Sequence, residues 1–205
     1  MTAVIDYGLG NIYSVVMAVR RCQEEVLTTS NPDDLKKVDR IILPGVGAFD
    51  EGMDNLNKLG LASAIKEEVS KKKPTLAICL GMQMIFEQSE EGNQAGLGIF
   101  KGKVVRFKRN NLPVPHMGWN QVFFQEKAAD YLKSVGQNQF FYFAHSYYVL
   151  PQDHLIVAGV TEYGCRFVSF VCWENVIGVQ FHPEKSGTSG LSFLSVFLRQ
   201  MPNAP

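Results

Sequence analysis

The 205-residue sequence is 46% hydrophobic, which is enough for one well-filled core and short for two. Its 20 Lys and Arg residues balance 20 Asp and Glu residues, which argues against a dedicated nucleic-acid binder or membrane-surface protein. No apolar run is long enough to span a bilayer, and the early Asp6 breaks any signal-peptide pattern. Four dispersed cysteines without a CxxC pair predict free thiols, a cytoplasmic location, no metal site and no cofactor.

The first half of the chain alternates short apolar runs, typical of buried strands, with amphipathic stretches typical of helices. The expected strands are Ala3–Tyr7, Arg40–Leu43 and Thr75–Cys79, and the expected helices lie over residues 12–19, Leu61–Lys72 and Met82–Glu87. Strand–helix–strand alternation of this kind predicts an α/β fold with a parallel sheet covered by helices on both faces.

The second half is richer in strands, with Gly, Asn and Pro between them. The expected strands are Val104–Phe107, Val122–Phe124, Phe140–Phe143, Leu155–Val160, Phe167–Trp173 and Val176–Phe181. A closing helix that starts at Ser189 carries an apolar stripe of Leu191, Leu194, Phe197 and Leu198, which we expect to pack into the core. We therefore predict one domain over residues 1–205, with a mostly parallel central sheet and an antiparallel extension.

Cys79 ends a buried strand and is followed at once by a helix start, which is the form of a nucleophile elbow. Ala77 and Gly81, two residues to either side, are small enough to leave room for the sharp turn. A helix N-terminus at this point would favour the thiolate. Taken alone, the pattern leaves open that Cys79 merely fills space in the core, as many cysteines do.

A candidate base for this nucleophile ends another apolar strand. His182 and Glu184 lie two residues apart, so in an extended chain their side chains point the same way, and Pro183 favours extension before it. The carboxylate would then fix one imidazole nitrogen while the other faces Cys79. His116, His145 and His154 lack a carboxylate at that spacing.

The turn Pro44–Phe49 follows a third strand end and is rich in glycine. The backbone N–H groups of Val46 and Gly47, together with that of Leu80, could hold the oxyanion of a tetrahedral intermediate. A phosphate loop is the less suitable alternative because the Walker lysine and its Ser/Thr are missing, and a plain turn stays possible. All three motifs follow strand ends, where open α/β sheets build their sites.

The segments Pro44–Phe49, Ala77–Gln83 and Gly178–Glu184 resemble the class I glutamine amidotransferases, and the resemblance covers essentially the whole chain. It implies a flavodoxin-like α/β fold and a catalytic triad of Cys79, His182 and Glu184 that hydrolyses L-glutamine through a thioester. Ala77 departs from the family pattern, in which glycine is common. The resemblance also implies that four residues bind the substrate, namely Gln83, Glu91, Ser146 and Tyr147.

Further segments are similar to the branch of this family that serves histidine biosynthesis: Asp6–Asn11, Pro115–Asn120 and Phe143–Tyr148. That likeness implies a heterodimer in which a separate cyclase subunit receives the ammonia. Residues similar to those at the junction are Asn11, Trp119, Tyr142 and Lys185. The alternatives are a glutaminase of another pathway, a cysteine hydrolase on a related fold, and a binding module without activity.

Overall fold

Five parallel strands form the central part of the sheet in the computed structural model, which describes residues 1–108, 112–126, 128, 132, 135–137 and 139–199. In spatial order they are β2 (Val26–Thr29), β1 (Thr2–Ile5), β3 (Arg40–Leu43), β4 (Thr75–Ile78) and β13 (Val176–Val179). Every residue of β1, β4 and β13 is buried, as expected for strands covered on both faces. The predicted domain of residues 1–205 ends in residues 200–205, which lie outside the described residues.

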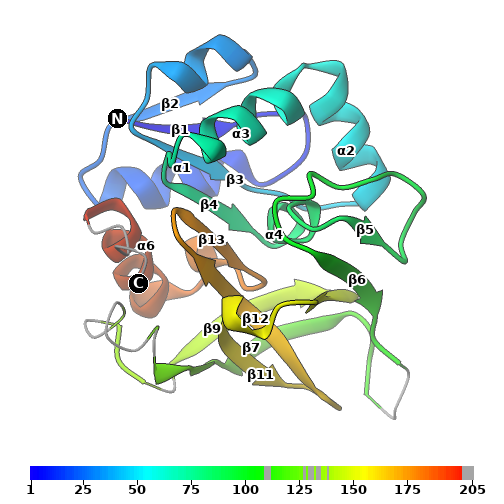
Figure 1. The fold of residues 1–205 in the computed structure, drawn as a ribbon. Coiled ribbons are helices and arrows are strands. Elements are labelled where there is room, and N and C mark those ends of the chain that lie inside the picture. Colours follow the sequence, from blue (N-terminus) through cyan, green and yellow to red (C-terminus); the bar gives the residue numbers. More distant parts are fainter. Residues whose placement is uncertain (109–111, 127, 129–131, 133–134, 138, 200–205) are drawn as a thin grey trace.

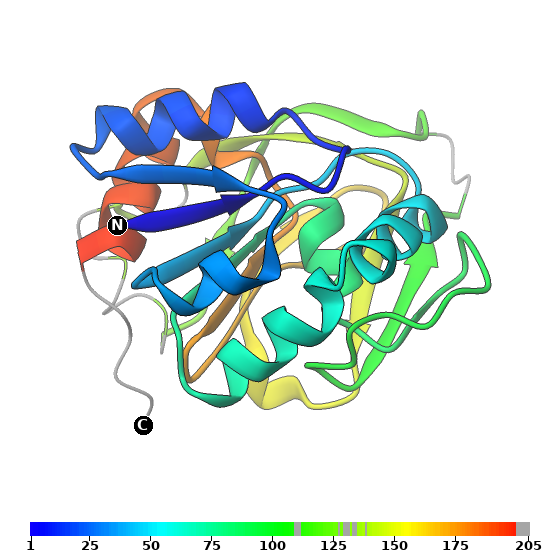
Figure 2. The same cartoon turned by 90° about the horizontal axis from the view of Figure 1, so that it is seen from above.

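Helices cover the two faces of this sheet (Figures 1 and 2). On one face lie α1 (Ile12–Arg21) and α6 (Gly187–Arg199), and on the other lie α2 (Phe49–Lys58), α3 (Leu61–Ser70) and α4 (Leu80–Met84). Alternate strand residues serve the two layers: Val4 packs with the first set, and Ala3 and Ile5 pack with the second.

An antiparallel extension continues the sheet from β13. It consists of β12 (Arg166–Trp173), β10 (Tyr147–Pro151) and β6 (Gly102–Arg106), with the short β5 (Gln88–Ser89) parallel to β6 at the edge. The strands β11 (Val157–Glu162) and β8 (Phe123–Phe124) pair beside β12. A separate ribbon pairs β7 (His116–Gln121) with β9 (Phe140–His145). The predicted α/β class with a mostly parallel sheet and an antiparallel extension is confirmed.

Several predicted boundaries were wrong. The strand expected from Leu155 begins only at Val157, because the Asp153 side chain accepts from Leu155 N–H and starts the 3-10 turn η2 (His154–Ile156). The helix expected over Met82–Glu87 is the shorter and earlier α4. The closing helix α6 starts at Gly187 rather than at Ser189. The strands β2, β7 and β10, the helix α2 and the 3-10 turn η1 (Pro32–Lys36) were not anticipated.

Candidate active site

Cys79 lies at the end of β4 in a backbone conformation that side chains rarely adopt, with φ 54° and ψ −106°. Its N–H donates to the carbonyl oxygen of Val179 at 2.7 Å, which ties the turn to β13. A Cβ at Gly81 would overlap the carbonyl oxygen of Leu43, so this position of the turn requires glycine. The tight turn predicted from the sequence is present, and the strain is of the kind that functional sites retain.

The helix that follows Cys79 is shorter than we expected. The helix α4 spans only five residues, Leu80–Met84. A single turn and a half of helix aligns few peptide dipoles, so α4 stabilises a thiolate less than a long helix would. The negative charge at Cys79 therefore depends mainly on neighbouring side chains.

His182 provides the strongest of these neighbours. Its Nδ1 lies 2.8 Å from Oε1 of Glu184, and both side chains are only 2% exposed. The second ring nitrogen is left free of Glu184, and the Cys79 side chain lies close enough to raise the pKa of the ring. Among the described residues no donor reaches the buried Oε2 of Glu184, so the carboxylate acts on the imidazole alone. The predicted contact of His182 with Glu184 is present, and the role of Cys79, His182 and Glu184 as a triad stays a prediction.

Opposing effects determine the charge of His182. Burial on its own would lower the pKa of His182, but the adjacent Cys79 sulfur and the Glu184 carboxylate outweigh burial and raise it to about 10. With this pKa the ring of His182 is an imidazolium at neutral pH, and a neighbouring imidazolium is one of the groups that favour a cysteine thiolate. This is the state in which a cysteine is nucleophilic.

The ring of His182 is positioned by the ribbon strand β9. The backbone N–H of His182 donates to the backbone carbonyl oxygen of Tyr142 at 2.8 Å. Ser186 completes the connection, because its Oγ donates to the His182 carbonyl at 2.6 Å and accepts from Tyr142 N–H at 2.9 Å. The 3-10 turn η3 (Pro183–Lys185), with Pro183 at its start, begins directly after His182 and brings Glu184 back onto the ring.

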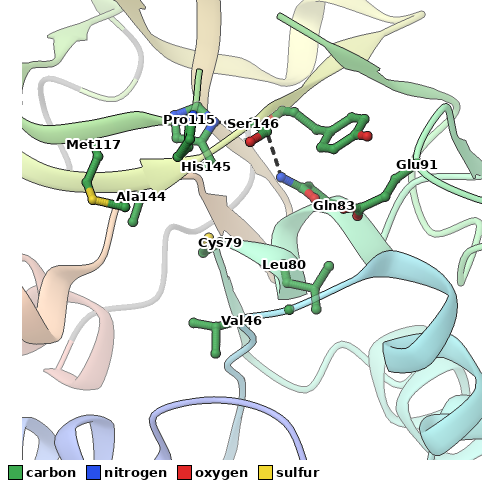
Figure 3. A pocket seen from close by; sticks show the side chains of 12 residues that line it. Val46, Cys79, Leu80, Gln83, Glu91, Pro115, Met117, Ala144, His145 and Ser146 are labelled. Carbon is green, nitrogen blue, oxygen red and sulfur yellow. Dashed lines mark hydrogen bonds between the residues drawn. The ribbon is translucent and has the colours of Figure 1, made fainter. Parts of the chain in front are cut away.

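A cavity of about 180 Å³ opens above Cys79 (Figure 3). Val46 and Leu80 lie on one side of it, and Ala144, His145 and Ser146 lie on the other. Eight of the residues predicted for the site line this cavity, namely Val46, Gly47, Cys79, Leu80, Gln83, Glu91, Ser146 and Tyr147. Pro115, Met117, Ala144 and His145 complete the lining and were not predicted.

The predicted oxyanion-hole turn has an unexpected feature. The Leu80 N–H, one of its expected donors, donates to the carbonyl oxygen of Gly45 at 3.3 Å. The turn is held from behind by Tyr7, whose hydroxyl donates to the Pro44 carbonyl at 2.9 Å. In this conformation a carbonyl oxygen, and not an oxyanion, is the partner of Leu80 N–H.

Glu91 and Gln83 occupy the end of the cavity away from Cys79 (Figure 3). One oxygen of Glu91 accepts from Phe49 N–H at 2.9 Å, which links it to the start of α2. Burial raises the pKa of Glu91, although the Phe49 N–H opposes the shift. The Gln83 Nε2 donates to the Tyr147 carbonyl at 3.1 Å and to Gln180 Oε1 at 3.2 Å.

Three of the four predicted interface residues form a contiguous group. The ring of Trp119 meets the ring of Tyr142 edge-on at 6.3 Å, and Lys185 Nζ lies 5.8 Å from the centre of the Tyr142 ring. Trp119 is 57% exposed, which is unusual for so large an apolar side chain. The fourth, Asn11, caps α1 by accepting from Ser14 N–H, and α1 packs against η3.

In the described part of the chain, no three His, Cys, Asp or Glu side chains are grouped as metal ligands. No helix among the residues that the structure describes is long and apolar enough to cross a membrane. Cys22, Cys79 and Cys165 are free thiols.

Comparison with known proteins decides the family. The model of the family "glutamine amidotransferase class-I" matches residues 3–201. The chain belongs to the class I glutamine amidotransferase family. Two solved structures share this fold at low sequence identity. One is named as a glutamine amidotransferase and has a TM-score of 0.76, with 15% identity and 96% of each chain covered. The other is PurLQS from Thermotoga maritima, with a TM-score of 0.74, 19% identity and 96% of each chain covered.

Curated relatives of this amidotransferase are much closer in sequence. A Methanococcus maripaludis protein is 44% identical over 98% of this chain and 100% of its own length. A Pyrococcus furiosus protein is 46% identical over 96% of this chain and 97% of its own length. Both are named as the HisH subunit of imidazole glycerol phosphate synthase.

Two polar residues of the site were not predicted from the sequence. Gln180 is fully buried, and its Nε2 lies 3.6 Å from Cys79 Sγ. The signal was available, because Gln180 precedes His182 by two residues and so shares its direction in an extended chain. His145 was set aside for want of a nearby carboxylate in the sequence, yet it lines the cavity.

Proposed function

We propose that this chain is the glutaminase subunit of imidazole glycerol phosphate synthase, which works in the cytoplasm and passes ammonia to a separate cyclase subunit. The observation that carries the hydrolytic part is the buried His182–Glu184 hydrogen bond close to Cys79, whose side chain lines a cavity. The names of the Methanococcus and Pyrococcus relatives support the branch of the family. The free thiols of Cys22, Cys79 and Cys165 support the reducing compartment.

In the first half of the reaction, the Cys79 thiolate attacks the side-chain amide carbon of L-glutamine. The tetrahedral intermediate collapses when the His182 imidazolium gives its proton to the leaving nitrogen, which departs as ammonia. A glutamyl thioester on Cys79 remains. The Glu184 carboxylate keeps the proton on Nδ1 of His182 throughout, so the nitrogen facing the sulfur is the one that transfers protons.

In the second half, neutral His182 takes a proton from a water molecule, and the resulting hydroxide attacks the thioester carbon. The C–S bond breaks, glutamate leaves, and the proton on His182 restores the ion pair with the Cys79 thiolate. No cofactor or metal takes part in this scheme, because the imidazole supplies both proton transfers.

The far end of the cavity suits the main-chain groups of glutamine. The Glu91 carboxylate would bind the α-ammonium group, and backbone N–H groups of Ser146 and Tyr147 would bind the α-carboxylate. Gln83 uses both Nε2 hydrogens within the protein, so only its Oε1 is left for the substrate. It therefore accepts from an N–H group of glutamine rather than donating to its carboxylate.

The oxyanion turn would be the point of control. Here the Gly45 carbonyl accepts from Leu80 N–H, which leaves that donor unable to serve an oxyanion. Rotation of the Gly45–Val46 peptide would turn the Gly45 carbonyl away from Leu80 N–H and turn the Val46 N–H towards the cavity, where both donors could serve an oxyanion. The neighbouring Gly47 has a φ of +111°, a conformation that requires glycine. We expect the liganded cyclase to favour the rotated form, so that glutamine is not hydrolysed without use for the ammonia.

The cyclase would dock on the exposed group of Trp119, Tyr142 and Lys185, with Asn11 nearby at the start of α1. This surface lies directly beside the turn that holds His182, which suits a partner that responds to glutamine hydrolysis. The cyclase would use the ammonia to make imidazole glycerol phosphate and aminoimidazole carboxamide ribotide.

The decisive experiment measures ammonia release from glutamine by the chain alone, with the cyclase, and with the cyclase and its nucleotide substrate. We expect slow hydrolysis by the chain alone and strong activation by the liganded partner. Cys79→Ala should lose about three orders of magnitude or more in glutamine hydrolysis, while synthesis from added ammonium salts continues on the cyclase. A rate of glutamine hydrolysis that does not change when the cyclase is added would favour a glutaminase of another pathway. A chain that does not hydrolyse glutamine under any of these conditions would favour another cysteine hydrolase.

A further inference from the structure

The side chain of Gln180 lies between two residues of the site. It follows directly after β13 and is fully buried. Its Nε2 lies 3.6 Å from Cys79 Sγ, within hydrogen-bond distance for sulfur, and its Oε1 accepts from Gln83 Nε2 at 3.2 Å. The hydrogen-bonding scheme of the catalytic triad does not use this amide.

The orientation of both amides follows from their neighbours. The Tyr147 carbonyl oxygen can only accept, so the Gln83 group that faces it at 3.1 Å must be the donor Nε2. The second hydrogen of Gln83 Nε2 then points to Gln180, whose oxygen must face Gln83. The Gln180 Nε2 is thereby turned to Cys79, where it can donate and cannot accept.

A second series of hydrogen bonds fixes the Tyr147 carbonyl. His145 Nδ1 lies 2.7 Å from it and must donate, so His145 Nε2 is an acceptor and faces His116 Nδ1 at 3.0 Å. His116 Nε2 must then accept from Asn120 Nδ2, which lies 3.2 Å away.

The far end of this series requires the same assignment. Asn120 Nδ2 faces the carbonyl of Glu162 at 2.9 Å, and its Oδ1 accepts from Gln121 N–H at 2.7 Å. Each donor along the series therefore meets an acceptor only if both histidines are neutral, each with its proton on Nδ1. The series ends by holding Gln83, and through it Gln180, in one orientation.

We propose that Gln180 is a further catalytic residue, whose side-chain amide donates a hydrogen bond to the Cys79 thiolate. The proposal rests on the proposed role of Cys79 as the nucleophile. A donor without acceptor capacity stabilises the charged sulfur more than the neutral thiol, because hydrogen bonds to ions are the stronger ones. His145 and His116 are positioning residues that act through Tyr147 and Gln83.

Other groups near the sulfur have distinct roles. His182 is close enough to Cys79 to feel its charge and is hydrogen-bonded to the Glu184 carboxylate, and His145 of β9 is close enough to feel the charge of His182. Tyr7 after β1 is close enough to feel the charge of Cys79, but its hydroxyl donates to the Pro44 carbonyl. Gln180 is thus the uncharged donor directed at the sulfur.

The test is the pH dependence of alkylation of Cys79 by iodoacetamide in the full chain, because only the thiolate reacts. Gln180→Met keeps the unbranched shape and removes the donor. We expect the midpoint of the pH–rate profile of Gln180→Met to lie about one pH unit higher than that of the unaltered chain. Below the midpoint the variant should then hold about tenfold less thiolate and react about tenfold more slowly. The control is Asn175→Met, which removes a buried amide at the other end of β13, where it donates to the Val69 and Lys73 carbonyls.

A Gln180→Met midpoint equal to that of the unaltered chain would overturn the proposal. Should this variant fail to fold, the unaltered protein provides a second measurement: the side-chain amide resonances of Gln180 should shift as the sulfur titrates and should not do so in Cys79→Ala. Resonances that ignore the titration would equally overturn it. The alkylation test is separate from the proposed function, because it needs no glutamine. If the unaltered chain does not hydrolyse glutamine but Gln180→Met still shifts the midpoint, the proposed function is contradicted and the role of Gln180 at Cys79 is not.

Discussion

The molecule contains two buried histidine centres with opposite electrostatic behaviour. His182 at the end of the parallel sheet is 2% exposed, and the ribbon pair His116 and His145 is 2% and 5% exposed. Burial lowers the pKa of His116 to about 4 and that of His145 to about 3. At His145 the hydrogen bond to the Tyr147 carbonyl acts in the opposite direction and raises the pKa, but burial outweighs it. At His182 the effect of burial is outweighed by Cys79 and Glu184, and its pKa rises to about 10.

The comparison shows that burial alone does not decide the charge of a histidine. What decides it is whether the ring faces anionic groups, as His182 does, or another imidazole and a carbonyl, as His145 does. The charged centre is suited to move protons, and the neutral pair is suited to hold atoms in place. The ribbon strand β9 joins the two, because it carries His145 and also the Tyr142 carbonyl that accepts from His182 N–H.

Of the changes that test this comparison, Glu184→Gln should have the largest effect, because it removes the anion that holds His182. Glutamine hydrolysis in the cyclase complex should fall by about a hundredfold or more, because the ring loses its tautomer and its charge. The raised pKa of His182 adds stability that is complete below about pH 6.5 and is lost as the pH rises through about 10. Without the carboxylate this alkaline loss should begin at lower pH.

The matched control is Glu174→Gln, which breaks a surface ion pair with Lys72 and should change neither quantity. Urea unfolding across the alkaline range, together with the hydrolysis assay, checks both effects. An unchanged rate in Glu184→Gln would mean that the carboxylate has no part in catalysis.

The neutral pair should respond to pH with the opposite sign. Since the pKa values of His116 and His145 are lowered in the folded chain, the unfolded chain binds more protons as the pH falls from about 6.5 towards 4. The free energy of unfolding should therefore fall by about 1.4 kcal/mol for each ring and each pH unit in that range. Urea unfolding at several pH values should show a shallower acid slope in His116→Phe, and equal slopes would contradict the assignment.

The smallest effect in the isolated chain is expected from Trp119→Ala, on the outer face of the same ribbon. Since Trp119 is 57% exposed, its removal should change the unfolding free energy of the isolated chain by no more than about 1 kcal/mol. Activation of glutamine hydrolysis by the liganded cyclase should nevertheless weaken, because the proposed docking surface is reduced. Full activation with unchanged affinity for the cyclase would remove Trp119 from that surface. Leu155→Ala, another exposed apolar side chain, serves as the control.

Local patterns in the sequence carry much of the fold and part of the site. Apolar runs before Cys79 and His182 predicted two strands, which the structure pairs with each other. The contact of His182 with Glu184 was also predicted, although a 3-10 turn and not an extended chain brings the two side chains together. The helix α2 was missed because its residues include Asp50, Glu51 and Gly52, which weaken the apolar pattern.

Features that depend on pairing across the chain could not be predicted in the same way. His116 and His145 are 29 residues apart and meet only through the register of β7 with β9. The Gly45 carbonyl that faces Leu80 N–H reflects the orientation of one peptide, which residue types do not determine. Gln180 was within reach of the spacing argument, but an uncharged amide is not among the residue types that first suggest catalysis.

The most direct test of the account is to treat the chain with an electrophilic glutamine analogue and to map the modified residue by mass spectrometry. We expect a single label on Cys79 that glutamine competes away, faster labelling in the presence of the liganded cyclase, and none in Cys79→Ala. A label on Cys22, Cys165 or Cys172 with Cys79 unmodified would contradict it.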